Sequence, residues 1–386
     1  MESYSLPDKA SYSDIEDAFQ KVKLHPGLKL TLPNLLGCKG GLGVEGLLCQ
    51  LIATWIRENP KDRVYQVNAV SEDSDPFKKL CSSLYGTCAL KYSSKIYNRE
   101  NELIDKNSAL EYAYESVRKV NSGFYYDAYQ DQYATVFSFK SPGPNKEYNN
   151  KIYLGKDSID RNYVRILVRE IIDALVLDHE HYFNISEFVD SVSAIVSELF
   201  DNTHNHSRHD VNGSSLAENF RAIIIDCSEI NSERLIELTK DGVLGMSSIY
   251  TDWDGWMKKN NSNIPILDIT VVDSGPGYAR RWTSKDAADL TWREEVEAIE
   301  RCFTKNFTTS KNYASGSGLS HVMRDVKKLK GWFTLRTGRA LVSKSFHNGQ
   351  GSIKVLEKNM KENEAFVEGV SFNISVPLVD MGSDHV

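Results

Sequence analysis

The sequence predicts an α/β protein composed of two parts. In some segments apolar residues recur at every second position, as in a strand, and in others about every 3.6 positions, as in a helix. The two kinds of segment alternate along the chain. The chain of 386 residues is also long enough to form two hydrophobic cores. With 41% hydrophobic and 26% charged residues, the composition is that of an ordinary globular protein.

Composition and charge exclude several classes of protein. No apolar run approaches the roughly 20 residues needed to cross a bilayer. The first thirty residues carry charges throughout and lack the apolar core of a signal peptide. We therefore expect a cytoplasmic protein with no membrane contact. A net charge of −7 argues against a protein that coats nucleic acid, so nucleic acid is not indicated as a partner.

The six cysteines indicate neither a metal site nor a disulfide framework. No two of them form the closely spaced pair that structural zinc sites and redox dithiols use. We interpret them as reduced, mostly packed thiols. They are Cys38, Cys49, Cys81, Cys88, Cys227 and Cys302.

The first half of the chain predicts an α/β unit. Residues 28–32 (LKLTL) have the pattern of a strand, and residues 44–58 place their apolar side chains on one helical stripe. Residues 63–67 (RVYQV) indicate the next strand.

A polar stretch at residues 141–150 contains two prolines and a glycine and is the best candidate for a linker. We therefore place a domain boundary there. Residues 1–150 form an α/β domain of unassigned function, and residues 151–386 form a second domain.

Helices and strands also alternate in the second half. A helix is expected across residues 163–177, and another begins near Asn184, where Glu187 completes a capping box. The same periodicities predict strands at residues 222–225 and 266–272, a long polar stretch to residue 315, a helix from Gly318, and terminal strands that end in SFNISVPL.

Three polar residues share one face of the helix that begins near Asn184. Glu198, Asn202 and His206, in SELFDNTHNHS, are spaced by four, while apolar residues occupy the opposite side. An amide oxygen can ligate Mg²⁺ together with phosphate oxygens and water, and a carboxylate can orient or deprotonate an attacking water. The pattern favours metal-assisted hydrolysis. The alternative is the solvated polar face of an amphipathic helix.

A strand that ends in Asp-Ser-Gly-Pro-Gly supplies the second motif. It presents Asp273 at its end, and Gly275 and Gly277 allow the backbone to approach a flat ligand without an intervening Cβ. The carboxylate is suited to accept a hydrogen bond from an exocyclic amine such as that of adenine. The alternative is a plain turn at the end of a strand.

The third motif is SGSGLSHVMRDV, in which Gly316 and Gly318 open a helix. The free backbone N–H groups and the dipole at such a helix start favour a phosphate. A glycine pair before a helix is a weak signal alone, but the order and spacing of all three motifs make a much stronger one.

In order and spacing, the three motifs resemble the GHKL superfamily. This ATP-binding domain is shared by sensor histidine kinases, anti-sigma-factor serine kinases, DNA gyrase, the mismatch-repair protein MutL and a family of chaperones. The resemblance covers roughly residues 160–380 and implies a Bergerat α/β sandwich that binds ATP and Mg²⁺. It implies that Glu198 is the general base, that Asn202 ligates the metal and that Asp273 binds the adenine amino group.

The same resemblance places further residues at the nucleotide. Two pairs of glycines match the family's glycine boxes, and FTKNFTTSK is similar to the stretch that precedes the second box. The predicted cofactor-binding residues are Asn202, His206, Asp273, Gly275, Gly277, Lys311, Gly316, Gly318 and Leu319.

Residues 278–315 correspond to the family's lid over the nucleotide. Its basic residues are candidate phosphate contacts, although solvated charge is the simpler interpretation of any single one. They are Arg280, Arg281, Lys305 and Lys311. Three departures from the family pattern leave the branch open, namely Asn205, Ser320 and Val370.

A zinc site is the first competing interpretation. HNHSRHD, at residues 204–210, superficially resembles the HxHxDH site of metallo-β-lactamase-like hydrolases. Arg208 occupies the place of the required aspartate, and the residues continue a helix, whereas that site lies in a loop after a strand. These differences argue against a zinc hydrolase.

Two further patterns compete less well. GLGVEG, at residues 41–46, fits a dinucleotide fingerprint, but Pro33 and seven more residues separate it from its strand, so a glycine-rich helix entry is the alternative. His179 resembles a histidine-kinase phosphoacceptor but lies too close to Glu198 for a helical hairpin to intervene.

Together these features predict a Mg²⁺-dependent ATPase that acts as a nucleotide-dependent switch on the N-terminal domain or on a partner. Two alternatives stay open: a protein serine/threonine kinase of the anti-sigma type, and a regulatory module that binds nucleotide without hydrolysing it. The expected partners are ATP and either another protein or a second copy in a homodimer.

Overall fold

The computed structural model shows a mixed α/β protein, which confirms the predicted fold class. The described part contains a five-stranded sheet (sheet A), a six-stranded sheet (sheet B) and a two-stranded ribbon. None of its helices has the length and apolar character needed to span a membrane. The described residues are 2–34, 42–68, 75–124, 133–140, 147–148, 152–154, 158–175, 185–240, 246–304, 318–347, 349 and 351–379.

Sheet A and its helices come from the N-terminal part of the chain. Its strands follow chain order and are parallel, except for the last, which is antiparallel. The strands are β1 (Ser3–Ser5), β2 (Lys29–Thr31), β3 (Val64–Gln66), β4 (Lys95–Tyr97) and β5 (Leu103–Ile104). The helices are α1 (Tyr12–Leu24), α2 (Val44–Glu58), α3 (Asp75–Cys81), α4 (Leu84–Tyr92) and α5 (Lys106–Asn121). The order of β2, α2 and β3 confirms the predicted strand, helix and strand.

Sheet B is antiparallel throughout. Its strands, in spatial order, are β12 (Trp332–Ser345), β13 (Met360–Pro377), β11 (Ile264–Asp273), β10 (Asn219–Ile230), β6 (Tyr133–Lys140) and β7 (Glu147–Tyr148). The ribbon pairs β8 (Tyr153–Leu154) with β9 (Ser158–Ile159). The strands predicted at residues 222–225 and 266–272 are confirmed as the inner parts of β10 and β11.

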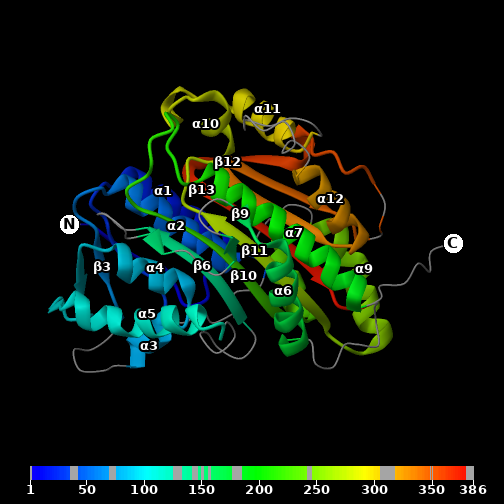
Figure 1. Cartoon of the computed structure of the whole chain (residues 1–386), viewed down its shortest axis with the longest axis horizontal. Coiled ribbons are helices and arrows are strands. Elements are labelled where there is room, and N and C mark those ends of the chain that lie inside the picture. The colour runs from blue at the N-terminus through cyan, green and yellow to red at the C-terminus, as the bar shows by residue number, and fades with distance from the viewer. Residues whose placement is uncertain are drawn as a thin grey trace.

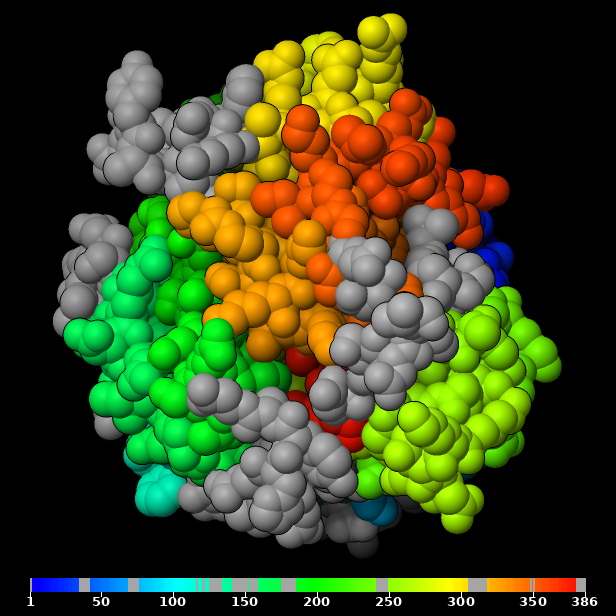
Figure 2. Space-filling view, turned by 90° about the vertical axis from the view of Figure 1, so that its right-hand side faces the viewer, coloured from blue at the N-terminus to red at the C-terminus, as the bar shows by residue number. Residues whose placement is uncertain are grey.

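Helices cover both faces of sheet B. Figure 1 shows α6 (Arg161–Leu175), α7 (Ile185–His206) and α12 (Gly318–Lys328) in front of the sheet, with α1 and α2 behind it. In Figure 2, α12 (orange) lies between the green helices α6 and α7 and the yellow-green α9 (Met246–Asn260). Helix α8 (Ser232–Lys240) follows β10 and packs against α9.

The two faces of sheet B differ in chemistry because successive residues of a strand point to opposite sides. On β11, Asp268 and Thr270 face α2. The N-cap residue of α2, Gly43, offers no side chain, and its N–H donates to Asp268 Oδ2 at 2.8 Å. A Cβ on Gly46 would lie 2.3 Å from Thr270 Cγ2, so glycine allows α2 to pack closely on the sheet. This packing explains the described glycines of GLGVEG as a helix entry.

Two elements that precede the predicted linker belong to the architecture of sheet B. Strand β6 pairs with β10, and Phe137 lies opposite Ala222. Helix α2 packs on β11 and β13. One hydrophobic core includes residues of both sheets. The boundary at residues 150 and 151 stays a prediction, and these contacts join its two sides.

The polar stretch after β11 contains two helices, α10 (Tyr278–Thr283) and α11 (Trp292–Cys302), with a 3₁₀ turn, η1 (Ala287–Asp289), between them. A capping box begins α11, because the Thr291 hydroxyl accepts from Glu294 N and the Glu294 carboxylate accepts from Thr291 N. A second 3₁₀ turn, η3 (Glu357–Asn359), precedes β13.

Candidate functional site

The three sequence motifs meet at one pocket on the α7 face of sheet B. Its walls come from α7, the end of β11, α10, the end of α11, the start of α12, and β13. The space between these walls, including the part that is open to solvent, amounts to about 920 Å³. The predicted site residues in its lining are Asn202, His206, Asp273, Gly277, Gly318 and Leu319.

Asn202 and His206 of α7 both line the pocket, as their spacing of four predicts. The apolar residues of α7 do not all lie opposite them, because the buried Ile195 is two helical turns before Asn202 and therefore on the same side. Burial and the charge of Arg281 lower the pKa of His206 to about 4. The imidazole is therefore neutral at pH 7. Its Nδ1 atom is buried and has no hydrogen-bond partner within the part of the chain that the structure describes.

Glu198 lies at the junction of α7 and α12, one helical turn before Asn202. A Cβ on Gly318 would lie 2.1 Å from Glu198 Oε1, so the glycine makes room for this carboxylate. The other oxygen, Oε2, forms an ion pair with Arg161 Nη2 at 3.1 Å. Because Arg161 is 64% exposed, the pair contributes at most about 1 kcal/mol and can open readily.

Asp273 lines the pocket as a carboxylate that is only 5% exposed. Burial raises its pKa to about 7, although the N–H groups of Gly275 and Val370 and the charge of Arg221 act in the opposite direction. The Gly275 N–H donates to Asp273 Oδ1 at 2.8 Å. A buried carboxylate that lines a pocket and has a strongly raised pKa is a candidate functional group.

Three glycines allow segments around Asp273 to pass close to one another. A Cβ on Gly275 would lie 2.5 Å from the backbone at the end of α7, and Gly275 does not itself line the pocket. Gly277 has φ +78°, and its Cβ would lie 2.9 Å from Thr337 Oγ1. Gly369 on β13 also has φ +78°, and its Cβ would lie 1.9 Å from the Asp273 carbonyl oxygen. No local sequence pattern indicates this role of Gly369, because it depends on the pairing of β13 with β11.

Aromatic side chains and one thiol form part of the pocket wall. The aromatic residues are Tyr278 and Trp282 of α10 and Phe372 of β13, and the thiol is that of Cys302 at the end of α11. Burial raises the pKa of the Cys302 thiol to about 12, so the thiol stays neutral. The spacing of four between Tyr278 and Trp282, directly after the glycine turn, is the sequence signal that could have predicted these two.

The basic residues expected in the lid have different surroundings. Arg280 Nη1 donates to both carboxylate oxygens of Glu368, at 2.8 and 3.0 Å, so this guanidinium is bound at β13. Arg281 lines the pocket, and its Nη1 donates to the Asp210 carbonyl at 3.2 Å. Lys305, Lys311 and Gly316 lie outside the described residues.

The histidine-rich segment at the end of α7 does not converge on one point. His204 is fully buried in the helix, and His209 forms a β-bridge with Ser215. In the described ranges, no group of three His, Cys, Asp or Glu residues is arranged to hold a metal ion. The geometry therefore offers no support for the zinc-hydrolase alternative.

The chain matches no protein-family model, no curated protein and no solved structure. Any function assigned to it therefore rests on its motifs and on the pocket that they form.

Proposed function

We propose that the protein binds Mg·ATP in this pocket and hydrolyses it, as a GHKL-type ATPase whose nucleotide state acts on the N-terminal α/β unit or on a partner. One observation supports the proposal most strongly. The buried carboxylate of Asp273 shares a pocket with Asn202 of α7 and with Gly318 at the N-terminus of α12. An acceptor for an amine, an amide oxygen and a helix N-terminus complement three different parts of ATP.

Asp273 binds the adenine end in this proposal. Its carboxylate accepts a hydrogen bond from the exocyclic amine, and the purine ring lies among the apolar and aromatic side chains of the wall. Ring faces and a buried acceptor fix the orientation of the base together. The base then contacts β11, β13 and α10, which carry Asp273, Phe372 and Tyr278.

The phosphates extend toward α7 and α12. Backbone N–H groups at the start of α12 donate to phosphate oxygens, and the positive end of the helix dipole favours their charge. Arg281 adds a cation to the same pocket. Asn202 is the residue that would hold Mg²⁺ together with the phosphate oxygens, and the metal would neutralise phosphate charge there.

Glu198 acts as the general base. It takes a proton from water while the water oxygen bonds to the γ-phosphorus and the bond to the β,γ-bridging oxygen breaks, which leaves ADP and inorganic phosphate. Its position one turn before Asn202 and beside Gly318, both of which line the pocket, supports this role. Arg161 binds this carboxylate until water replaces it.

Glu198→Gln tests the proposed reaction. We expect phosphate release to fall at least about 100-fold because the general base is lost, while calorimetry shows nearly unchanged affinity for Mg·ATP. Glu187→Gln is a matched control, because Glu187 is on the same helix and pairs with Lys328 of α12 outside the pocket lining. An unaltered rate in Glu198→Gln would remove Glu198 from the base role.

The kinase alternative uses the same residues, because Glu198 can take a proton from a serine hydroxyl as well as from water. Incubation with γ-labelled ATP and cell extract distinguishes the two, since a kinase transfers the label to protein. Binding without either product would identify the regulatory module that does not hydrolyse ATP.

A further inference from the structure

Two segments of the C-terminal part meet behind Asp273. The loop that follows Asp273 begins with Ser274, and residues 218–220 span the start of β10. The Ser274 hydroxyl accepts from Phe220 N at 2.8 Å, and Ser274 N donates to the Phe220 carbonyl at 3.1 Å. The two segments are therefore fixed to each other beside the pocket.

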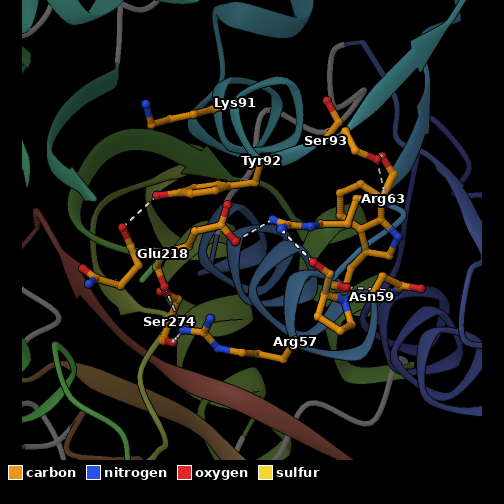
Figure 3. A network of polar contacts seen from close by, with 12 residues as sticks. Arg57, Asn59, Arg63, Lys91, Tyr92, Ser93, Glu218 and Ser274 are labelled. Carbon is orange, nitrogen blue, oxygen red and sulfur yellow. Dashed lines mark hydrogen bonds and ion pairs between the residues drawn. The ribbon is translucent and has the colours of Figure 1, made fainter. Parts of the chain in front are cut away.

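Side chains from the N-terminal part bind both segments (Figure 3). Arg57 Nη2, at the end of α2, donates to the carbonyl oxygens of Glu218 at 3.0 Å and of Ser274 at 3.1 Å. Tyr92 OH, at the end of α4, donates to the Asn219 carbonyl at 2.7 Å. Arg63 Nη1 forms an ion pair with Glu218 Oε2 at 2.7 Å. Of the two arginines, Arg57 is the one with a hydrogen bond to Ser274 in the described structure.

The contact of Arg57 reaches the carboxylate of Asp273 through one peptide bond. The Ser274 carbonyl and the Gly275 N–H belong to the same planar peptide unit. Arg57 donates to its oxygen at 3.1 Å, and its N–H donates to Asp273 Oδ1 at 2.8 Å. Hydrogen bonds in such a chain polarise one another, so a charged donor at the oxygen strengthens donation by the N–H.

Arg57 is mostly buried and has charged residues of both signs around it. Burial lowers its pKa, while the charge of Glu368 and Glu218 raises it. The charge of Arg280, which lies in α10, also lowers the pKa of Arg57. Arg280 itself forms an ion pair with Glu368 of β13. A mostly buried guanidinium stays in place only when hydrogen bonds and counter-charges compensate for its desolvation.

We propose that Arg57 is a positioning residue of the nucleotide site: it holds the Ser274–Gly275 peptide so that the Gly275 N–H points at the Asp273 carboxylate. The N-terminal α/β unit thereby acts on nucleotide binding through α2. This inference rests on the proposed function, because it assigns a role to Arg57 in the binding of the adenine end.

The test measures adenosine affinity against pH by calorimetry, because adenosine carries no phosphate that titrates. The adenine amine binds the ionised form of Asp273, so affinity rises with pH through a midpoint near 7, the pKa of Asp273, and levels off about one pH unit above it. Loss of Arg57 weakens the N–H donor and moves this midpoint upward.

The other charged and titratable groups around Asp273 are Arg221 on β10, His206 on α7, Tyr278 and Arg281 on α10, and Cys302 on α11. The pKa of His206 is about 4, that of Cys302 is about 12, and that of Tyr278 is raised well above its ordinary value by burial. None of these three groups changes its charge near pH 7. Asp273→Asn, which removes the titrating carboxylate, should abolish the midpoint.

Arg57→Gln is expected to raise the midpoint by about one pH unit, which weakens adenosine binding about fivefold at pH 7 and about tenfold well below pH 7. Arg63→Gln is the control, since it removes a contact to Glu218 and leaves the Ser274 carbonyl bound. If Arg57→Gln does not fold, Arg57→Lys and Arg63→Lys form a milder pair, in which Arg57→Lys alone shifts the midpoint upward.

The outcomes separate this inference from the proposed function. If the unmodified chain binds neither adenosine nor ATP, the proposed function fails. If it binds both and the midpoint is the same in the Arg57 variant as in the unmodified chain, the nucleotide site stands and the role of Arg57 is refuted. An equal shift in the Arg63 variant also refutes it, because the effect would then belong to the whole interface.

Discussion

Asp273 shows how a single residue of the candidate site lowers the stability of the fold at neutral pH. Its pKa is about 7, against 3.8 for an ordinary aspartate, mainly because it is buried. The folded chain therefore keeps this proton at pH values where the unfolded chain has lost it. The free energy of unfolding falls as pH rises from about 4 to about 7 and stays lower above that range. The fold alone does not compensate the desolvation of the ionised carboxylate. In the proposed complex, a hydrogen bond from the ligand amine does so.

Gly318→Ala tests the placement of Glu198, the proposed general base. The new Cβ would lie 2.1 Å from Glu198 Oε1 and 2.9 Å from its Cδ, so the Glu198 side chain must move. A displacement of about 1 Å at a catalytic group lowers turnover by about 100-fold. Steady-state phosphate release should show this loss, while thermal melting shows a folded protein because a flexible side chain absorbs the clash.

Equal turnover in the Gly318→Ala variant would contradict the placement of Glu198 at the reacting phosphate. Gly255→Ala serves as the control, because no heavy atom lies within 4 Å of the added Cβ in the middle of α9.

At the scale of residues, local spacing predicted part of the site and tertiary contacts supplied the rest. A spacing of four placed Asn202 and His206 on one face of α7, and both line the pocket. Arg161 and Glu198 are 37 positions apart, and Arg57 and Ser274 are 217 apart. No periodicity relates such pairs, because they meet only after sheet B and its covering helices have formed.

At the scale of elements, α7, β11 and α12 were predicted because each has its own strong apolar period. Helices α10 and α11 were not, because their apolar residues are few in a stretch rich in charge. The capping-box pattern of Thr291 and Glu294 is the local sequence signal that could have predicted the start of α11. The order β12, β13, β11, β10 and β6 could not be derived, since strand pairing depends on contacts far apart in the sequence.

Gly46→Ala tests how α2 covers sheet B. The added Cβ would lie 2.3 Å from Thr270 Cγ2 and 2.7 Å from Ser371 Oγ. Overpacking at a buried contact of this kind lowers the free energy of unfolding by about 1–3 kcal/mol. Urea denaturation should detect the loss. Gly255→Ala should instead be neutral or stabilising by up to about 1 kcal/mol, because it replaces an exposed helical glycine with space around it. If both variants were equally stable, α2 would not lie against Thr270 as described.

At the scale of the whole molecule, the N-terminal part completes the sheet that carries the candidate site. Strand β6 protects the edge of β10, and α1 and α2 cover the face opposite α7. The polar side chains of that face, including Asp268, have their hydrogen-bond partners partly in α2. The proposed switch therefore needs no separate connection between the two parts, because they share one core.

A fragment of residues 151–386 tests this dependence. It lacks β6 and α2, so it exposes the edge of β10 and the α2 face of sheet B. We expect the fragment to lack a cooperative thermal transition by circular dichroism, whereas the full chain shows one. A cooperative transition at the temperature of the full chain would show that the predicted domain boundary is also a folding boundary.

Calorimetric titration of Mg·ATP at pH 8 into the unmodified chain and into Asp273→Asn tests the central claim most directly. Asp273 is ionised at this pH, and a hydrogen bond to a charged group contributes about 1.5–3 kcal/mol. We predict saturable binding with one site per chain, weakened at least about tenfold in the variant. Thermal melting should show that Asp273→Asn is at least as stable as the unmodified chain, because the variant no longer buries an ionised carboxylate. Equal affinity in the two proteins, or no binding to either, would contradict the assignment of this pocket to ATP.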